Sequence, residues 1–263
     1  MSGARQTPRL TAEQEPFLAV RSLATNYASG YRIEHHHHPW HQFLYATSGA
    51  MTVTTPKSSW MIPTGRAVFI PARSSHAIRM WGTVEMRTLY LSPDLTSFDD
   101  KECQVVEVGP LLRALILRTV EALGLDSRVA HDSRMIGLLE DEVKAAISAG
   151  ESSLELPMPQ DERARALADH VLTQPKSEES VDKLAHLHAV ARRTLERRFR
   201  DETGMSFGMW RQKARLLDSI RLLAEGKSVT DAALDCGYSS VSAFIAAFKS
   251  TFGYTPGRGS IAP

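Results

Sequence analysis

Cysteine is scarce in the 263 residues, and so are long apolar runs and any excess of one charge. The two cysteines, Cys103 and Cys236, lie far apart and form no Cys-x-x-Cys pair. We therefore expect neither a disulfide framework nor a zinc finger, and both thiols are predicted to be small and buried. No apolar run reaches the roughly eighteen residues that span a bilayer, and the polar opening Met1–Glu15 lacks the apolar core of a signal peptide. These absences predict a cytoplasmic protein with no membrane partner.

Short β-prone segments separated by Gly, Pro and Ser make up the first third of the chain, and they predict a sandwich or barrel. The clearest of them are residues 42–46, 51–55, 67–70 and 86–91. Apolar residues at helical spacing then predict helices over 111–123 and 134–147. Residues 150–160 carry two prolines and two serines, which is typical of a linker, and the chain beyond them is predicted to be helical.

A helix-turn-helix pattern occurs twice in the last third, first in residues 183–204 and again in residues 231–253. Leu195, Phe199 and Gly204 of the first copy have the same spacing as Phe244, Phe248 and Gly253 of the second. The turns of the two copies differ in length by one residue. Between the copies, apolar residues three and four apart from Trp210 to Leu223 predict one long helix that ends at Gly226. Such a repeat can present two helices to the DNA major groove at a fixed separation.

The second helix of the first copy carries five arginines within nine residues, although the whole chain has a net charge of only +1. Arginine binds guanine bidentately and also pairs with phosphate, whereas a solvated basic face is the alternative explanation. The residues expected to contact DNA in this helix are Arg192, Arg193, Thr194, Glu196, Arg197 and Arg200.

In the second copy, Ser240 is a plausible N-cap, and Phe244 and Phe248 take the inward positions. The outward residues are small and largely apolar, so they suit thymine methyl groups or close backbone packing better than hydrogen bonds to bases. The residues expected to contact DNA here are Ser240, Val241, Ser242, Ile245, Ala246 and Lys249, the last of them on phosphate.

The residues Gly237-Tyr238-Ser239-Ser240, Ser242-x-Phe244, Phe248-Lys249 and Gly253-x-Thr255-Pro256 resemble the C-terminal pattern of AraC/XylS-type transcription regulators. The resemblance covers about the last hundred residues. It implies recognition helices in successive major-groove segments, with base-facing residues Arg193, Glu196 and Arg197, and then Val241, Ser242, Ile245 and Ala246.

Three positions of the first unit depart from that pattern, and Gly257-Arg258-Gly259 replaces its usual closing Tyr-Arg. Ala189 and Ala191 replace the usual turn glycine and serine N-cap, which should weaken the start of the helix by about 1 kcal/mol. Arg198 stands where an apolar residue is more common.

The N-terminal part contains the run His35-His36-His37-His38-Pro39-Trp40-His41. Strand neighbours alternate sides, so His36 and His38 can share one face while His35 and His37 share the other. The spacing of Gly30, His36, His38, Gln42 and Gly49 resembles the first cupin motif, with Gln42 in place of the usual glutamate.

Residues Gly65, Pro71 and His76 resemble the second cupin motif, with Arg73 and Met80 replacing its glycine and asparagine. The cupin resemblance covers residues 18–91 and implies a small double-stranded β-helix barrel of the kind that AraC-type regulators use to sense ligands. The His-Pro-Trp-x-Gln run also resembles an AraC subgroup that often regulates an adjacent efflux gene.

By analogy with metal cupins, His36, His38, Gln42 and His76 would bind one divalent ion, and three imidazoles with an amide oxygen suit zinc, nickel, iron or manganese. The loss of the carboxylate should weaken that binding. Alternatively the histidines line a pocket for a small organic effector, and Trp40 could equally belong to the core. The residues proposed for such a pocket are His36, His38, Trp40, Gln42, Tyr45, His76 and Arg87.

Together these patterns predict an α+β protein with two domains, an N-terminal cupin-like β-barrel with accessory helices and a C-terminal all-α domain with two helix-turn-helix units. The expected divisions are a mobile arm (1–17), a sensing and dimerising domain (18–149), the linker (150–160) and the DNA-binding domain (161–263). The expected partners are promoter DNA, a small-molecule effector, a second copy of the chain and, for an activator, RNA polymerase. The alternatives are a metal-dependent cupin enzyme, an isomerase or dioxygenase, with an appended helical domain, and a barrel that only dimerises.

Overall fold

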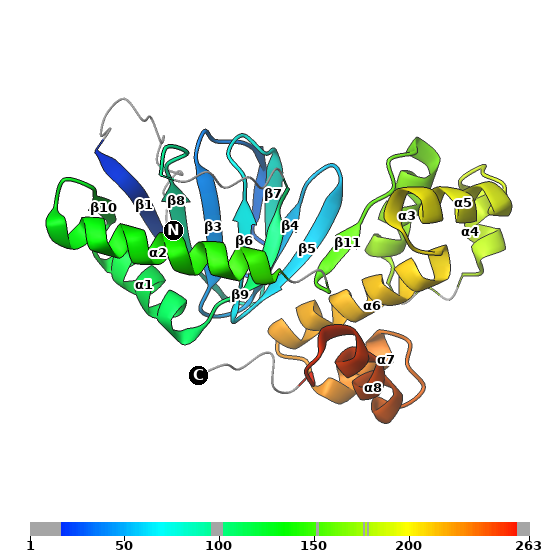
Figure 1. The fold of residues 1–263 in the computed structure, drawn as a ribbon. Coiled ribbons are helices and arrows are strands. Elements are labelled where there is room, and N and C mark those ends of the chain that lie inside the picture. Colours follow the sequence, from blue (N-terminus) through cyan, green and yellow to red (C-terminus); the bar gives the residue numbers. More distant parts are fainter. Residues whose placement is uncertain (1–16, 96–101, 151–152, 176, 178, 257–263) are drawn as a thin grey trace.

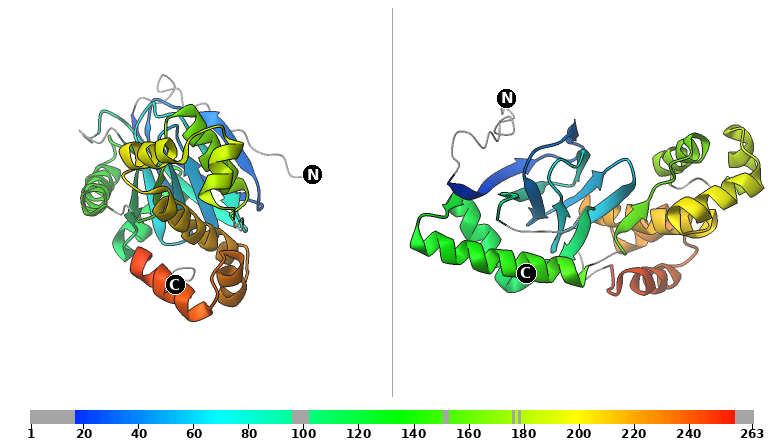
Figure 2. Two further views of the ribbon diagram at one scale, coloured as in Figure 1. Left: turned by 90° about the vertical axis from the view of Figure 1, so that its right-hand side faces the viewer. Right: turned by 45° about the horizontal axis from the view of Figure 1, so that its top comes forward.

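The computed structural model describes residues 17–95, 102–150, 153–175, 177 and 179–256. Its strands come first in the chain and its helices gather in the second half, as the sequence predicts. In Figures 1 and 2 the helices α3–α8 lie together beside one end of a strand-rich body. The predicted mobile arm lies outside the described residues except for Phe17. Within those residues, no helix is long and apolar enough to cross a membrane.

Two antiparallel sheets form the N-terminal body. The larger sheet has the strand order β10-β1-β8-β3-β6-β9, with bounds Gly124–Asp126, Leu18–Tyr27, Val84–Leu91, His41–Ala46, Arg66–Ile70 and Gln104–Glu107. The smaller sheet has the order β11-β5-β4-β7-β2, with bounds Glu155–Pro157, Ser58–Pro63, Ala50–Thr54, His76–Trp81 and Arg32–His36. The prediction of a barrel or sandwich of short strands is therefore confirmed.

The two faces of the smaller sheet differ in burial because side chains alternate along each strand. On β4, Met51 and Val53 are fully buried and face the other sheet, whereas Thr52 and Thr54 are half-exposed on the outer face. Apolar side chains fill the space between the sheets, among them Leu44, Ile62 and Met80.

The outer face of the larger sheet is covered by α1 (Pro110–Glu121) and α2 (Ala130–Ala149). Phe43 and Phe69 form a buried cluster with the inward faces of these helices, which include Leu112, Ile116 and Leu139. Both helices were expected from apolar spacing, and Figure 1 shows them lying along the strand-rich body.

The segment predicted as a linker is not wholly irregular. Its residues Glu155–Pro157 form β11, which pairs with β5 through the register Glu155↔Trp60 and Pro157↔Ser58. Leu154 and Leu156 are buried there, so apolar contacts and a sheet edge order a stretch whose prolines and serines indicated a loop. Strand β11 therefore fixes where the chain leaves the barrel.

The C-terminal helices are α3 (Glu162–Thr173), α4 (Val181–Leu187), α5 (Arg192–Thr203), α6 (Phe207–Ala224), α7 (Val229–Asp235) and α8 (Val241–Phe252). Helices α4 and α5 form the first helix-turn-helix unit, α7 and α8 form the second, and α6 is the predicted long helix between them. Phe199 of α5 packs edge-on against Phe207 and Trp210 of α6, with ring centroids 5.1 and 5.2 Å away. These buried rings hold the first unit against α6.

Helix α6 also packs against the smaller sheet, so the two halves of the chain are in contact. The Trp210 indole Nε1 donates a hydrogen bond to the Pro157 carbonyl at 2.7 Å. Gly82, in the turn after β7, adopts a φ of 68°, and a Cβ there would lie 2.3 Å from the Ala224 carbonyl oxygen. Only glycine allows this approach of the barrel to the end of α6.

Candidate DNA-binding surface and histidine cluster

Helix α5 presents the basic face that the sequence predicts. Leu195 and Phe199 are fully buried, whereas Arg193, Arg197 and Arg200 are exposed. Because the apolar side chains point into the domain, the arginines lie on the remaining surface of the helix. Arg192 is also exposed, and its Nη1 is 2.9 Å from Asp182 Oδ2 on α4.

Two other residues expected to contact DNA are placed differently. Glu196 is half-buried, and its Oε2 accepts a hydrogen bond from the Phe207 backbone N–H at 3.3 Å. Its carboxylate therefore also contacts the N-terminus of α6, where a negative charge is favourable. Thr194 is half-buried as well.

Arg198, which departs from the family pattern, has a structural role that sequence reasoning missed. Its Nε is 3.5 Å from Asp161 Oδ2, and its Nη1 is 3.7 Å from Glu202 Oε1. Asp161 is the N-cap of α3, and Glu202 accepts hydrogen bonds from the backbone N–H groups of Gln160 and Asp161. The guanidinium thus helps to tie α5 to the start of α3.

Helix α8 offers a smaller and less charged face. Ser242, Ala246 and Lys249 are exposed, whereas Val241 and Ile245 are half-buried and pack against the core of the domain. The Ser240 hydroxyl accepts a hydrogen bond from the Ala243 backbone N–H at 3.2 Å, which confirms the predicted N-cap. The corresponding residue before α5, Ala191, makes no such bond.

Three of the predicted metal ligands come together at one end of the barrel. The candidate ligand nitrogens of His36, His38 and His76 all lie within 4.8 Å of one another. The ring of His36 is 4.3 Å from that of His76, and the ring of His38 is 5.3 Å from it, measured between centroids. The prediction that His36 and His38 share a face is therefore confirmed.

Backbone carbonyls orient all three imidazoles in the same way. The Nδ1 atoms of His36, His38 and His76 lie 2.9, 2.7 and 2.9 Å from the carbonyl oxygens of Glu34, Trp40 and Ser74. A carbonyl only accepts, so each Nδ1 carries the proton and each Nε2 keeps its lone pair. This second contact is the arrangement by which proteins fix histidine metal ligands.

Burial disfavours the charged form of two histidines of the cluster. Burial lowers the pKa of His76 to about 4, and it also lowers the pKa of His38. The His76 Nε2 is buried and has no hydrogen-bond partner among the described residues. An unpaired lone pair at such a site is costly unless a ligand or ion satisfies it.

Gln42 completes the set expected from the cupin resemblance. It is buried, and its Oε1 lies 3.1 Å from His38 Nε2. With the proton of His38 on Nδ1, these two facing atoms are both acceptors. They are compatible if a cation lies between them, or if the Gln42 amide is turned so that its NH₂ group donates.

Three residues proposed for an effector pocket do not join this cluster. Tyr45 and Arg87 belong to the opposite face of the larger sheet, since Tyr45 packs in the cluster beneath α1 and α2, and Arg87 donates to Asn26 Oδ1 at 3.3 Å. The Trp40 ring is buried, and the guanidinium carbon of Arg21 lies 5.1 Å from the centroid of that ring. The backbone carbonyl of Trp40 contacts the cluster, through His38 Nδ1.

Sequence reasoning also missed Tyr90, whose buried ring meets His38 edge-on at 5.2 Å. Strand alternation from Met86 would have placed Tyr90 on the inner face. Burial raises the pKa of Tyr90, so the phenol stays protonated beside the histidines.

Both cysteines are buried, as the sequence predicts, and burial raises the pKa of each thiol to about 12. Because the thiolate is the reactive form, neither cysteine has the environment of a nucleophile.

Comparison with known proteins agrees with this two-part architecture. A family described as a helix-turn-helix domain matches residues 184–258, and a family described as a cupin domain matches residues 25–92. The transcriptional regulator NimR of Escherichia coli (strain K12) is 30% identical over 223 residues, which cover 85% of this chain and 80% of NimR. RipA of Corynebacterium glutamicum, an HTH-type transcriptional regulator, is 34% identical over 100 residues, which cover 38% of this chain and 30% of RipA.

Among solved structures, an apo variant of ToxT from Vibrio cholerae strain SCE256 aligns over 91% of this chain and 96% of its own, with 11% sequence identity and a TM-score of 0.41. The relationship to NimR, over most of both chains, is the finding that establishes the family. The chain belongs to the AraC-type helix-turn-helix transcriptional regulators, with a cupin domain in its N-terminal half.

Proposed function

We propose that this regulator reads promoter DNA mainly through α5 and positions itself through α8. The support is the chemistry of the two exposed faces: Arg193, Arg197 and Arg200 can bond bases and phosphates, whereas Ser242 and Ala246 can only make close, weakly discriminating contacts. Arg192 and Lys249 lie at the ends of these faces and suit phosphate. Thr194, Val241 and Ile245 have smaller exposed surfaces for such contacts.

The DNA assignment is tested by Arg197→Ala in a gel-shift titration with promoter DNA obtained by genome-wide mapping of bound sites. We expect specific binding to weaken by about 1–3 kcal/mol, because a bidentate contact to a base is lost. Arg32→Ala is the matched control, since Arg32 is an exposed arginine on β2 of the barrel. Equal affinities for the wild type and Arg197→Ala would contradict the assignment.

We further propose that His36, His38 and His76, with Gln42 as a fourth ligand, bind one divalent ion. The converging Nε2 atoms, the three backbone carbonyls behind them and the unpartnered His76 Nε2 support this proposal. Three neutral imidazoles and an amide suit zinc, nickel or ferrous iron better than calcium or magnesium, which prefer oxygen ligands. In a regulator, such an ion would either be the signal or hold this end of the barrel in shape.

Isothermal titration of the chelator-treated full chain with Zn²⁺ tests the metal site. We expect one ion per chain in the wild type and no comparable binding in His76→Ala. His131→Ala, which removes an exposed histidine on α2, should behave like the wild type. The metal proposal is wrong if the wild type takes up no ion, or if His76→Ala binds it equally well.

The histidine cluster is also the observation on which the alternative of a cupin isomerase or dioxygenase depends. The named relatives are transcriptional regulators, and we propose that this protein likewise acts by binding and not by catalysis. A stoichiometric redox-active ion in purified protein, together with turnover of a substrate, would favour the enzyme instead.

A small-molecule effector, a second copy of the chain and, if the regulator activates, RNA polymerase complete the proposed set of partners. The exposed apolar residues of α1 and α2 support pairing of these helices between two copies, since Leu111 and Leu138 are 49% and 43% exposed. Sedimentation of Leu138→Glu should show a shift from dimer to monomer. A wild type that sediments as a monomer at all accessible concentrations would contradict the pairing.

A further inference from the structure

A cleft of about 580 Å³ lies between the two halves of the molecule, outside the barrel. One wall is the outer face of the smaller sheet, with Thr52 of β4 and Met61 of β5. The other wall consists of α3 and α6, with Leu172 and Leu217. The volume lies within the range of small-molecule sites, roughly 300–1,000 Å³. The histidine cluster does not line this cleft, so the two sites are separate.

The lining of the cleft combines apolar surface with an excess of positive charge. Four arginines line it, against two aspartates: Arg79, Arg165, Arg215 and Arg221, with Asp169 and Asp218. The remaining lining is mostly apolar and includes Met158 and Leu156. Such a mixture suits a ligand with an apolar body and an acidic group.

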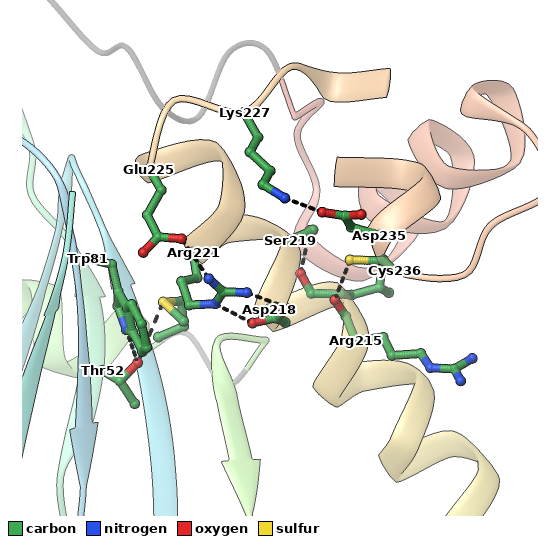
Figure 3. Close-up of polar contacts among 12 residues, drawn as sticks. Thr52, Trp81, Arg215, Asp218, Ser219, Arg221, Glu225, Lys227, Asp235 and Cys236 are labelled. Atoms are coloured by element: carbon green, nitrogen blue, oxygen red, sulfur yellow. Dashed lines mark hydrogen bonds and ion pairs between the residues drawn. The ribbon is translucent and has the colours of Figure 1, made fainter. Parts of the chain in front are cut away.

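Three of these arginines already have oxygen partners. Arg221 pairs with Asp218 and Glu225 at 2.5 and 2.6 Å, as Figure 3 shows. Arg215 donates to the carbonyls of Pro175 and Ser177, and Arg165 donates to the carbonyl of Pro56.

Arg79 is different. Its guanidinium carbon lies 4.0 Å from the centroid of the Trp81 ring, and its Nε is buried without a hydrogen-bond partner among the described residues. Arg221 approaches the same ring, at 5.1 Å, from the other side of the domain boundary. Burial, and the positive charges of Arg32 and Arg221, lower the pKa of Arg79. An anion in the cleft would satisfy the buried N–H group and offset the repulsion between these guanidinium groups.

We propose that this cleft is a second effector site, which binds a small organic anion with an apolar body. Arg79 holds the anionic group, the Trp81 ring and the apolar walls hold the body, and the Trp81 indole stays fixed by its hydrogen bond to Thr52 Oγ1 at 2.7 Å (Figure 3). Because the walls belong to the barrel and to α3 and α6, the bound anion stabilises the contact between the two halves. If DNA binding changes the contact between the two halves, then binding of the anion and binding of DNA affect each other's affinity.

The probe for this site is 8-anilinonaphthalene-1-sulfonate, whose fluorescence rises in apolar surroundings. We expect saturable binding to the full-length wild type, and binding about tenfold weaker or more in Arg79→Met, which keeps much of the side-chain volume but removes the charge. Arg128→Met is the matched control, because Arg128 is an exposed arginine that pairs with Asp126 and does not line the cleft. It should bind like the wild type, and so should His76→Ala.

Two further measurements separate this site from unspecific apolar binding. The uncharged N-phenyl-1-naphthylamine should bind the wild type and Arg79→Met equally. The sulfonate at saturation should change the affinity for promoter DNA in the wild type and leave that of Arg79→Met unchanged. The proposal is overturned if Arg79→Met binds the sulfonate as tightly as the wild type does, or if the wild type shows no saturable binding. Either result would leave the test of Arg197 on DNA unaffected.

Discussion

The two recognition turns provide a matched pair of substitutions with opposite expected effects. The turn between α4 and α5 has Ala189 at a φ of 51°, and the turn between α7 and α8 has Gly237 at 79°. The residue after each closes the turn in the same way, since Val190 N–H donates to the Ala185 carbonyl and Tyr238 N–H to the Ala233 carbonyl. Ala189→Gly should therefore stabilise the protein, and Gly237→Ala should destabilise it.

The magnitude follows from the backbone. A left-handed conformation costs a residue with a Cβ roughly 1–2 kcal/mol. Glycine avoids this cost, but the greater conformational entropy that it gives the unfolded chain lowers stability by about 0.4–1 kcal/mol. Ala189 is exposed, so its methyl group contributes little packing. A Cβ at Gly237 would lie 3.5 Å from Arg215 Nη1, which is an ordinary contact. Each substitution should therefore change the free energy of unfolding by about 0.5–1 kcal/mol, with opposite signs.

Urea unfolding followed by far-ultraviolet circular dichroism measures both variants. The double variant should return close to the wild type, because no hydrogen bond or ion pair between described residues joins the two turns. The reasoning is refuted if Ala189→Gly lowers stability, or if Gly237→Ala is neutral. If α5 is also better positioned in Ala189→Gly, gel shifts should show DNA affinity that is equal to or higher than that of the wild type.

Three further outcomes are expected. Ser240→Ala should lower the free energy of unfolding by about 1 kcal/mol in urea titration, because the N-cap of α8 is lost, whereas Ser250→Ala, which removes an exposed hydroxyl within the same helix, should not. Arg198→Ala should destabilise the chain more than Arg192→Ala, because only Arg198 lies between Asp161 and Glu202; equal losses would contradict this. In metal-free buffer, the free energy of unfolding should fall as the pH drops from about 6.5 to 4. The reason is that His76 takes up a proton in the unfolded chain over this range, whereas in the folded chain its pKa is about 4. In unfolding curves, His76→Gln should reduce this dependence of stability on pH.

Much of the fold was predictable because it depends on local patterns. Apolar residues three and four apart in α6 face a buried core whatever that core contains, and the capping serines and glycines mark where helices begin and end. The two-residue period placed His36 and His38 on one face before any sheet was known. Cys103 and Cys236 form no Cys-x-x-Cys pair, and a free cysteine behaves as a small apolar side chain, so their burial was predictable.

The positions that sequence reasoning misplaced depend on distant contacts. Glu196 looks free on a basic helix, but the N-terminus of α6 lies beside it. Arg198 looks like a misplaced charge until Asp161 and Glu202 are seen next to it. Tyr45 and Arg87 are a different case, because the two-residue period of the strands already places them on the face opposite Gln42 and Tyr90.

The amino-acid sequence by itself determined the family, the two recognition units, the long helix between them and the histidines of the barrel, because repeats, helical periodicity and motif spacing are properties of neighbouring residues. Only the tertiary structure decided how the halves meet. Strand β11 leaves the predicted linker to join the barrel, Gly82 lets the barrel approach the end of α6, and Arg79 and Arg221 meet over Trp81 from different domains. Such contacts across the two halves join residues 95 to 142 positions apart, and no local pattern records which surfaces will pack together.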